Sequence, residues 1–382
     1  MINKLTFLLT KRVTWSLNDD VDICIYSKIG SKHIVDCIEG KTYSIIDIDK
    51  YIYLKYFFRI PIRSFFKLCL NTLYIEYLKQ IITSINPKIL ITVIDNCKYF
   101  QSLDKHFHNQ IKVLTIQNGN RFFAKIKDIP DYHCNDGYFY NENDKIFHSN
   151  LLCYSQYEID QYRINKANVL NFHPIGPIYS SDYFKAFKKR KKRFDICFIT
   201  GGHLDRDTKH KAWEYLKKLA EENDIAICIA LKYNHHCRNF SKNIEIIEDF
   251  FSGTPVMVIP HSNNCMPAKI QIGKIVSTYY LSDISELTMG FASSALRESF
   301  ARGNKIYPIN FETENTYGVL SKLNLNMRPT YDEFKENIKE LINFDEKKYQ
   351  NINQELMKYF CVFDPKHLPK SKLKEIIENS IS

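Results

Sequence analysis

The chain has 382 residues, of which 45% are hydrophobic and 25% charged, with a formal net charge of +10. This composition excludes a fibrous or disordered protein and allows two globular domains. No run of about 18 apolar residues occurs, so no transmembrane helix is predicted, and the apolar N-terminal stretch is too short for a signal peptide. The 11 cysteines form no C-x-x-C pair, which indicates buried thiols in a cytoplasmic protein rather than disulfides or a structural zinc site.

In the first half of the chain, short apolar strands alternate with helical segments. One long amphipathic helix is predicted, because apolar residues recur at helical spacing from Phe66 to Ile85 and Asn86-Pro87 ends the pattern. Alternation of this kind favours a mostly parallel sheet. The strands are expected at the N-terminus and near 20–27, 88–95, 111–117, 150–154 and 168–173.

A second α/β series follows a lysine-rich segment. Strands are expected near 194–202, 224–232, 244–248, 255–260 and 305–311, and helices near 208–222, 295–302, 331–342, 347–359 and 370–380. The pattern predicts an α/β fold of two Rossmann-like domains facing a central cleft. The expected parts are an acceptor-side domain at 1–184, a basic linker at 185–193, a nucleotide-sugar-binding domain at 194–358 and a helical tail at 359–382.

Polar residues end two consecutive apolar strands of the first domain. Consecutive parallel strands place their ends at one edge of the sheet, facing the cleft. A carboxylate, amides and a guanidinium gathered there can bind sugar hydroxyls and support proton transfer. Ordinary strand-to-loop turns, with Asn-Gly as a turn signal, remain the structural alternative. The residues are Asp95 and Asn96 after the first strand and Gln117, Asn118, Gly119 and Arg121 after the second.

In the second domain, an apolar strand leads into Ser293-Ser294 and a helix that Gly303 should end. Free N–H groups and hydroxyls at a helix N-terminus suit a phosphate. With Ser294 as the N-cap, Glu298 lies one position beyond that of a capping box, which leaves its carboxylate available for ribose hydroxyls. A merely well-capped helix is the alternative.

These segments carry a family resemblance. The stretch from Thr278 to Phe311 resembles the donor-binding segment of GT-B surface-carbohydrate transferases, and ITVIDNCKYF, LTIQNGNR, LLCYSQYEIDQY and IGPIYSSDYF resemble a subgroup of surface carbohydrate biosynthesis proteins. That subgroup is similar to transferases that use CMP-activated 3-deoxy-D-manno-octulosonic acid (Kdo). The resemblance covers residues 80–330 in pieces.

The resemblance implies roles for particular residues. Ser293, Ser294 and Glu298 would contact the donor nucleotide, and Asp95 would lie near the reacting sugar. Glu158 is a second carboxylate for acid or base work. Lys232 stands where such proteins often carry Arg, so its charge is kept but the bidentate geometry is lost. The resemblance also implies catalysis without a bound metal or other cofactor.

A cytoplasmic glycosyltransferase is therefore the favoured function, with a nucleotide-sugar donor and an oligosaccharide or lipid-linked acceptor of a surface polysaccharide, capsule or lipopolysaccharide. A nucleotide-sugar epimerase and a polyol-phosphate transferase of the same fold stay open. A non-enzymatic basic binding protein is disfavoured, because most aromatic residues follow core periodicity, so no nucleic-acid partner is expected.

Two weaker signals complete the sequence. The histidine and cysteine neighbours at 235–237 and 261–265 lack the ligand number of a zinc site, so no metal is expected. The run KYFFRIPIRSFFK at 55–67 mixes basic and aromatic residues, which suits either a helix with snorkelling bases or a peripheral contact with the inner face of the cytoplasmic membrane.

Overall fold

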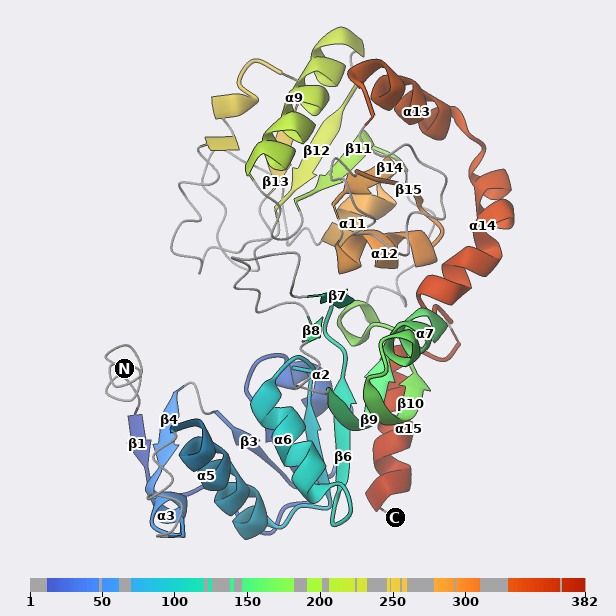
Figure 1. Ribbon diagram of the computed structural model, residues 1–382. Coiled ribbons are helices and arrows are strands. Elements are labelled where there is room, and N and C mark those ends of the chain that lie inside the picture. Colours follow the sequence, from blue (N-terminus) through green and yellow to red (C-terminus); the bar gives the residue numbers. More distant parts are fainter. Residues whose placement is uncertain are drawn as a thin grey trace. The chain divides into compact units, whose positions relative to one another are not determined.

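The structure is a computed structural model, and it divides the chain into two compact units. The first comprises Met1–Ser181 and Asp364–Ser382, and the second comprises Asp182–Phe363 (Figure 1). The last helix therefore belongs to the first unit, although almost two hundred residues of the second unit separate it from the rest. The residues that the structure describes are 12–47, 50–61, 70–119, 123–125, 138–140, 146–181, 191–200, 206–223, 225–231, 246–247, 249–254, 256–259, 278–291, 293–309, 329–364 and 366–381.

The first unit is built on a six-stranded parallel sheet with the order β10-β9-β6-β5-β2-β3. Its central strands β2, β5 and β6 are short and almost wholly apolar, as strands covered on both faces should be. The strands are β2 (Ile23–Tyr26), β3 (Tyr43–Ile46), β5 (Ile89–Thr92), β6 (Lys112–Ile116), β9 (Phe147–Cys153) and β10 (Asn168–Pro174).

Helices cover both faces of this sheet. Alternate residues of β2 enter different cores: Cys24 and Tyr26 pack with α5 (Leu70–Ile85) and α6 (Lys98–Phe107), while Ile23 and Ile25 pack with α2 (Ser31–Val35) and α15 (Pro369–Ile381). The last helix fits there because Leu373 and Ile377, four residues apart, share one buried face. α7 (Gln156–Ile164) follows β9, and η2 (Ile178–Ser180) follows β10.

A small outlying part extends the first unit beyond the main sheet. β1 (Arg12–Thr14) pairs in parallel with β4 (Tyr51–Tyr53), which runs directly into the one-turn helix α3 (Leu54–Phe57). Tyr77 of α5 anchors this part, because its hydroxyl accepts a hydrogen bond from the N–H of Tyr53 at 2.7 Å. A further two-stranded parallel pair joins β7 (Phe123–Lys125) and β8 (Tyr138–Tyr140).

The second unit contains a five-stranded parallel sheet with the order β13-β12-β11-β14-β15. One face packs on α9 (Arg206–Asn223) and α13 (Tyr331–Asn343) through a single apolar core. α11 (Thr278–Asp283) and α12 (Ser294–Ala301) also contact the sheet, and α14 (Glu346–Phe360) packs on α12. The strands are β11 (Phe194–Ile199), β12 (Ile227–Ala230), β13 (Val256–Ile259), β14 (Ser285–Gly290) and β15 (Lys305–Pro308).

Most predicted elements are confirmed, and one is wrong. The predicted long helix ends as expected at Ile85, with Asn86 in the left-handed region at φ 50°. A strand was expected near 244–248, but residues 246–247 are helical. Residues 1–11 of the expected N-terminal strand, Phe66 and the basic segment at 185–190 lie outside the described ranges, while Arg12–Thr14 form β1. Seven cysteines are described, all of them as free thiols.

Candidate functional site

The first candidate site lies where the strand order of the first sheet reverses. From β2 the chain adds β3 on one side and then β5 on the other, so the order reverses between β2 and β5. In open α/β sheets, ligands bind beyond the carboxyl ends of the strands at this point. Asp95 follows β5 by three residues and therefore lies at the reversal.

Asp95 is fully buried, and both its side chain and its main chain are held. Its Oδ1 accepts a hydrogen bond from the N–H of Asn118 at 3.2 Å, and its carbonyl oxygen accepts one from Nε2 of Gln101 at 3.1 Å. The first bond joins the loop after β5 to the loop after β6. The expectation that these two strand ends lie together is therefore confirmed.

Gln117 connects the same loops to a third strand. Its Nε2 donates to the carbonyl oxygen of Gly119 at 2.7 Å and to Oε1 of Glu158 at 3.2 Å, and its Oε1 accepts from the N–H of Tyr154 at 3.2 Å. The side chain is fully buried, so it fixes the loop from the inside. Asn96, Asn118 and Gly119 are partly exposed and are the predicted polar groups that a ligand can reach.

Glu158 lies in the first turn of α7, and hydrogen bonds engage both of its carboxylate oxygens. Oε2 accepts from the hydroxyl of Ser155 at 3.0 Å, and Oε1 accepts from Gln117. Ser155 is the N-cap of α7 and accepts from the N–H of Tyr157. Asp95 and Glu158 are thus two buried carboxylates joined through Gln117 and Asn118. Arg121 lies outside the described residues.

The loop after β2 borders the same edge and was not predicted as part of the site. Gly30 has φ +67°, and a Cβ added there would stand 2.3 Å from Cγ2 of Val93 and 2.5 Å from the hydroxyl of Tyr179. The ring of Tyr179 also meets that of His33 edge-on, with 4.6 Å between centroids. Gly30 therefore lets three strand-end loops approach closely, and the glycine after an apolar strand was the signal for this in the sequence.

The second candidate site lies at the reversal of the second sheet. β11 is followed by β12 on one side, and β14 later pairs with its other side, so the order reverses between β11 and β14. A Cβ on Gly290 would stand 2.7 Å from the carbonyl oxygen of Ile199, so this glycine lets the two strand ends approach. Ser293 and Ser294 follow three and four residues later and are partly exposed.

The cap of α12 differs from the expectation by one residue. Ser293, not Ser294, is the N-cap, since its hydroxyl accepts from the N–H of Ala295 at 3.3 Å. Glu298 then lies at the fifth helical position and is only 1% exposed, so the structure buries the side chain that was expected to meet ribose. Gly303 follows the C-cap with φ +89°, which confirms the predicted helix end.

Buried polar groups lie behind α12. Asp283 forms an ion pair with Arg302 and accepts a hydrogen bond from Nδ2 of Asn304 at 3.1 Å. Asn304 also donates to Ser299, whose hydroxyl donates to Thr288 of β14 at 3.2 Å. These bonds tie the C-terminal end of α12 to α11 and, through Ser299 and Thr288, to β14 of the sheet. Lys232 lies outside the described residues.

The described part of the chain has neither a metal-binding cluster of side chains nor a membrane-spanning helix. No group of three or more His, Cys, Asp or Glu side chains suited to a metal ion occurs there, and the histidine and cysteine neighbours noted in the sequence lie outside it. No helix in the described ranges combines the length and apolar character needed to cross a bilayer.

Solved structures match the chain over nearly its whole length. UDP-GlcNAc 2-epimerase from Neisseria meningitidis bound to UDP-GlcNAc is 12% identical, with a TM-score of 0.50, and the match covers 94% of this chain and 98% of that one. The wall teichoic acid polymerase TagF is 12% identical with a TM-score of 0.51, and the match covers 94% of this chain and 88% of that one. Arabidopsis thaliana UGT89C1 complexed with UDP-L-rhamnose is 9% identical with a TM-score of 0.51, and the match covers 96% of this chain and 100% of that one. No protein-family model and no curated protein sequence matches the chain.

The fold is of the GT-B type. Two Rossmann-like units with parallel sheets agree with these matches, which confirms the predicted fold class. At 9–12% identity the likeness concerns the fold alone. What the chain does must be argued from its own residues.

Proposed function

We propose that the chain is a cytoplasmic glycosyltransferase that moves a sugar from a nucleotide-activated donor to a growing cell-surface polysaccharide or glycolipid. The observation that carries the proposal is the position of the polar groups: in each unit they follow the strand beside the reversal of strand order. Ligands of open α/β sheets bind at such points. The specific donor that we propose is a CMP-activated acidic sugar such as Kdo, which suits the net charge of +10.

The donor phosphate is proposed to bind at the N-terminus of α12. The partly exposed Ser293 and Ser294 offer hydroxyls there, next to N–H groups at the positive end of the helix dipole. Lys232 is proposed to add a positive charge from the end of β12. Because Glu298 is buried, we assign it to positioning α12 behind the nucleotide rather than to facing the solvent.

On the first unit, Asp95 is proposed as the carboxylate of the reaction. It would accept the proton of the acceptor hydroxyl or attack the anomeric carbon, while Asn96, Asn118, Gly119 and Arg121 hold the sugar. Glu158 remains the second proposed acid or base, and its bond to Gln117 also lets it position the loop. We propose catalysis without a metal or other cofactor.

The test combines nucleotide binding with transfer. CMP should raise the melting temperature of the protein more than UDP or GDP does, and Asp95→Asn should keep that shift. The amide oxygen can still accept from Asn118, so the fold should persist, while transfer falls at least ~100-fold because an amide is neither base nor nucleophile. Glu39→Gln, a carboxylate-to-amide change at an exposed site of the same unit, is the control.

Three results would contradict parts of the proposal. Turnover of a nucleotide sugar without any acceptor would indicate an epimerase, and transfer of a polyol phosphate would indicate the other alternative. Transfer by Asp95→Asn within a few-fold of the parent would leave the function standing but remove Asp95 from the chemistry, and Glu158→Gln would then be tested.

A further inference from the structure

An exposed apolar surface lies on the outlying part of the first unit, where β1, β4 and α3 meet beside α5 (Figure 1). Trp15 is 63% exposed and Phe58 is 73% exposed, and Val13 and Phe57 are exposed beside them. Three of the five large apolar side chains that are more than 60% exposed in the described ranges belong to this group. We call Val13, Trp15, Phe57 and Phe58 the aromatic surface. Clustered exposure of this kind marks an interaction site.

These residues come from two chain segments that hydrogen bonds hold together. The carbonyl oxygen of Trp15 accepts from the N–H of Lys55 at 2.9 Å, so Trp15 lies against the first turn of α3. Val13 pairs with Ile52 of β4, two residues before that turn. The rings of Phe57 and Phe58 lie 6.3 Å apart, at the other end of α3.

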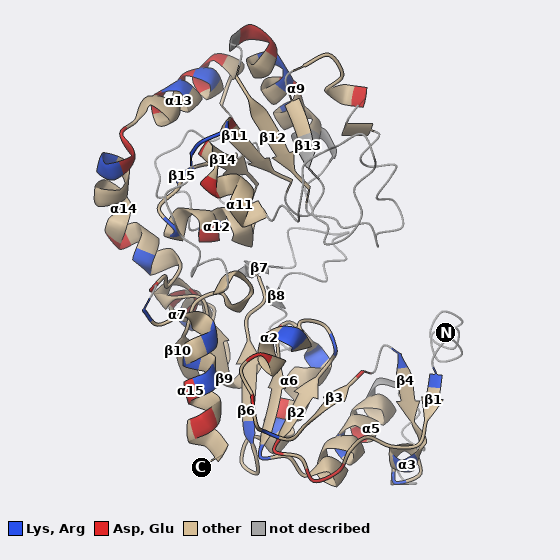
Figure 2. Cartoon of the chain, turned by 180° about the vertical axis from the view of Figure 1, so that it is seen from behind, with Lys and Arg blue, Asp and Glu red and all other residues tan. Residues whose placement is uncertain are grey.

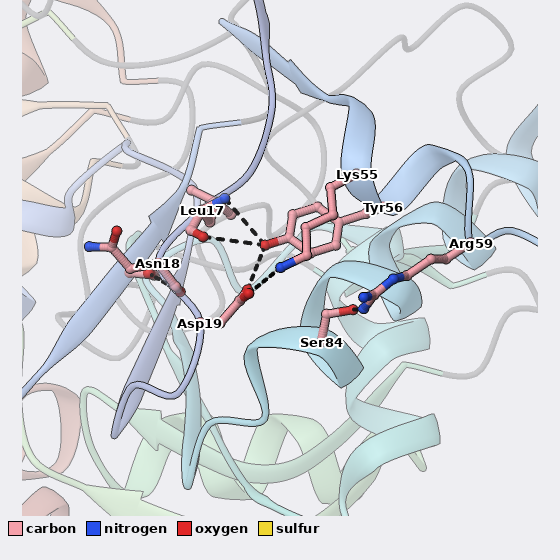
Figure 3. Close-up of polar contacts among 8 residues, drawn as sticks. Leu17, Asn18, Asp19, Lys55, Tyr56, Arg59 and Ser84 are labelled. Carbon is pink, nitrogen blue, oxygen red and sulfur yellow. Dashed lines mark hydrogen bonds and ion pairs between the residues drawn. The ribbon is translucent and has the colours of Figure 1, made fainter.

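A buried tyrosine joins the segment after β1 to α3 (Figure 3). Tyr56 is fully buried; its hydroxyl donates to Oδ1 of Asp19 at 2.9 Å and accepts from the N–H of Leu17 at 3.2 Å. Lys55 forms an ion pair with Asp19, which holds the pKa of that carboxyl below its usual value. Arg59 donates to the hydroxyl of Ser84 on α5 at 2.6 Å. The aromatic surface is therefore presented by a fixed scaffold.

Positive charge surrounds the aromatic surface. Arg12 and Lys50 are exposed and adjacent, since the N–H of Arg12 donates to the carbonyl oxygen of Lys50 at 2.8 Å, and Arg59 is exposed at the end of α3. Figure 2 shows blue segments at β1, β4 and α3. Of the nearby acids among the described residues, Asp19 is paired with Lys55, and Asp20 and Asp47 are the others. A second copy of the same basic surface would be repelled, whereas an anionic surface would be attracted.

We propose that the aromatic surface docks the protein peripherally on a lipid bilayer that carries anionic headgroups. The amphipathic ring of Trp suits the boundary between headgroups and acyl chains, and the apolar ring of Phe inserts into the acyl side of that boundary. Arg12, Lys50 and Arg59 contact the anionic headgroups and add electrostatic attraction to the apolar contact. The inference goes beyond the proposed transferase activity, because docking needs neither donor nor acceptor.

The test uses Trp15 itself as the reporter. The chain has two tryptophans, so Trp213→Phe leaves Trp15 as the only one. With vesicles of phosphatidylcholine and phosphatidylglycerol, its emission should shift to the blue and lose access to acrylamide, and vesicles of phosphatidylcholine alone should do this less. Added salt should weaken binding, because screening acts on exposed charges.

Variants then measure the contribution of each group. Trp15→Ser with Phe58→Ser should weaken co-sedimentation with the anionic vesicles at least about tenfold, which corresponds to ~1.4 kcal/mol. Ile352→Ser is the matched control, because Ile352 is 64% exposed on α14 of the second unit. Arg12→Glu with Lys50→Glu should also weaken binding, whereas Lys347→Glu, exposed on α14, should not.

Three results would overturn the inference. One is an unchanged Trp15 emission with anionic vesicles. Another is equal vesicle binding by the parent and the Trp15→Ser, Phe58→Ser variant. The third is self-association without lipid that Phe58→Ser abolishes, since it would assign the surface to a second copy of the chain. Loss of transfer activity with vesicle binding intact would instead count against the proposed function alone.

Discussion

Asp104 gives a pH-dependent stability that can be worked out from its surroundings. The side chain is fully buried on α6, where Oδ2 accepts from the N–H of Ser149 at 2.8 Å and Oδ1 has no hydrogen-bond partner among the described residues. Burial raises the pKa of Asp104 from its usual 3.8 to about 6, against smaller opposing effects of Ser149 and His108. Ionising it in the folded protein therefore costs about 3 kcal/mol relative to the unfolded chain.

The sign of the effect follows from which state binds the proton more tightly. Between about pH 4 and pH 6 the folded state holds the Asp104 proton and the unfolded state has released it, so this contribution to stability falls as pH rises and is lost above the folded pKa. Asp104→Asn removes the titration. Its amide oxygen can accept from Ser149, but its NH2 group occupies the position of Oδ1 and is left unsatisfied at about 1–3 kcal/mol.

The measurement is the difference in unfolding free energy between the parent and Asp104→Asn at several pH values, because other titrating groups cancel in that difference. The variant should be less stable by about 1–3 kcal/mol near pH 4. The gap should close or reverse by pH 8, for a total change of about 3 kcal/mol. A difference that stays constant from pH 4 to pH 8 would refute the reasoning and would mean that Asp104 is solvated in the folded state.

Two further predictions concern the second unit. Ser293→Ala should lower stability by about 1 kcal/mol, because it removes the N-cap bond to Ala295, whereas Ser294→Ala should leave stability almost unchanged. Both variants should reduce the melting-temperature shift given by CMP. A normal CMP shift in both variants would contradict the proposed phosphate site. Gly290→Ala should destabilise the second unit by about 1–3 kcal/mol, since its Cβ would meet the carbonyl oxygen of Ile199. The measurement is chemical unfolding. A curve within error of the parent would show that β11 and β14 can separate at no cost.

Much of the fold was predictable because its main strands carry a strong local signal. Strands covered on both faces are continuous apolar runs, and β5 and β12 are fully buried along their length. The end of such a strand is also visible, since the first polar residue marks where the chain leaves the core. For this reason Asp95 and Ser293 could be placed at sheet edges from the sequence.

Other elements left too little signal. β1 and β4 have three residues each and exist through pairing across almost forty residues of chain, so no periodicity predicts them. α6 was missed although Phe100, Leu103 and Phe107 show helical spacing in the sequence. The S-x-x-E signal at Ser155 and Glu158 was also readable, but in the structure Glu158 accepts from the hydroxyl of Ser155.

Burial of the charged site residues could not be predicted, because it depends on partners far away in the chain. The carboxylate of Asp95 meets an N–H group 23 residues away, and that of Glu158 meets an amide 41 residues away. Sequence spacing places a polar residue at a strand end but does not say whether its side chain turns outward to a ligand or inward to the neighbouring loop.

The two units reach the same arrangement by different strand orders. The first places its third main strand, β5, beside β2 and its second strand, β3, on the far side, whereas in the second it is the fourth strand, β14, that returns to β11. In both units, the connections that follow the two strands at the reversal lead toward opposite edges of the sheet. Ligands of open α/β sheets bind beyond the carboxyl ends of the strands at such a reversal. Asp95 in the first unit and Ser293 in the second each follow the returning strand. We propose the sugar chemistry for Asp95 because it is a carboxylate, and the phosphate site for Ser293 because it begins a helix.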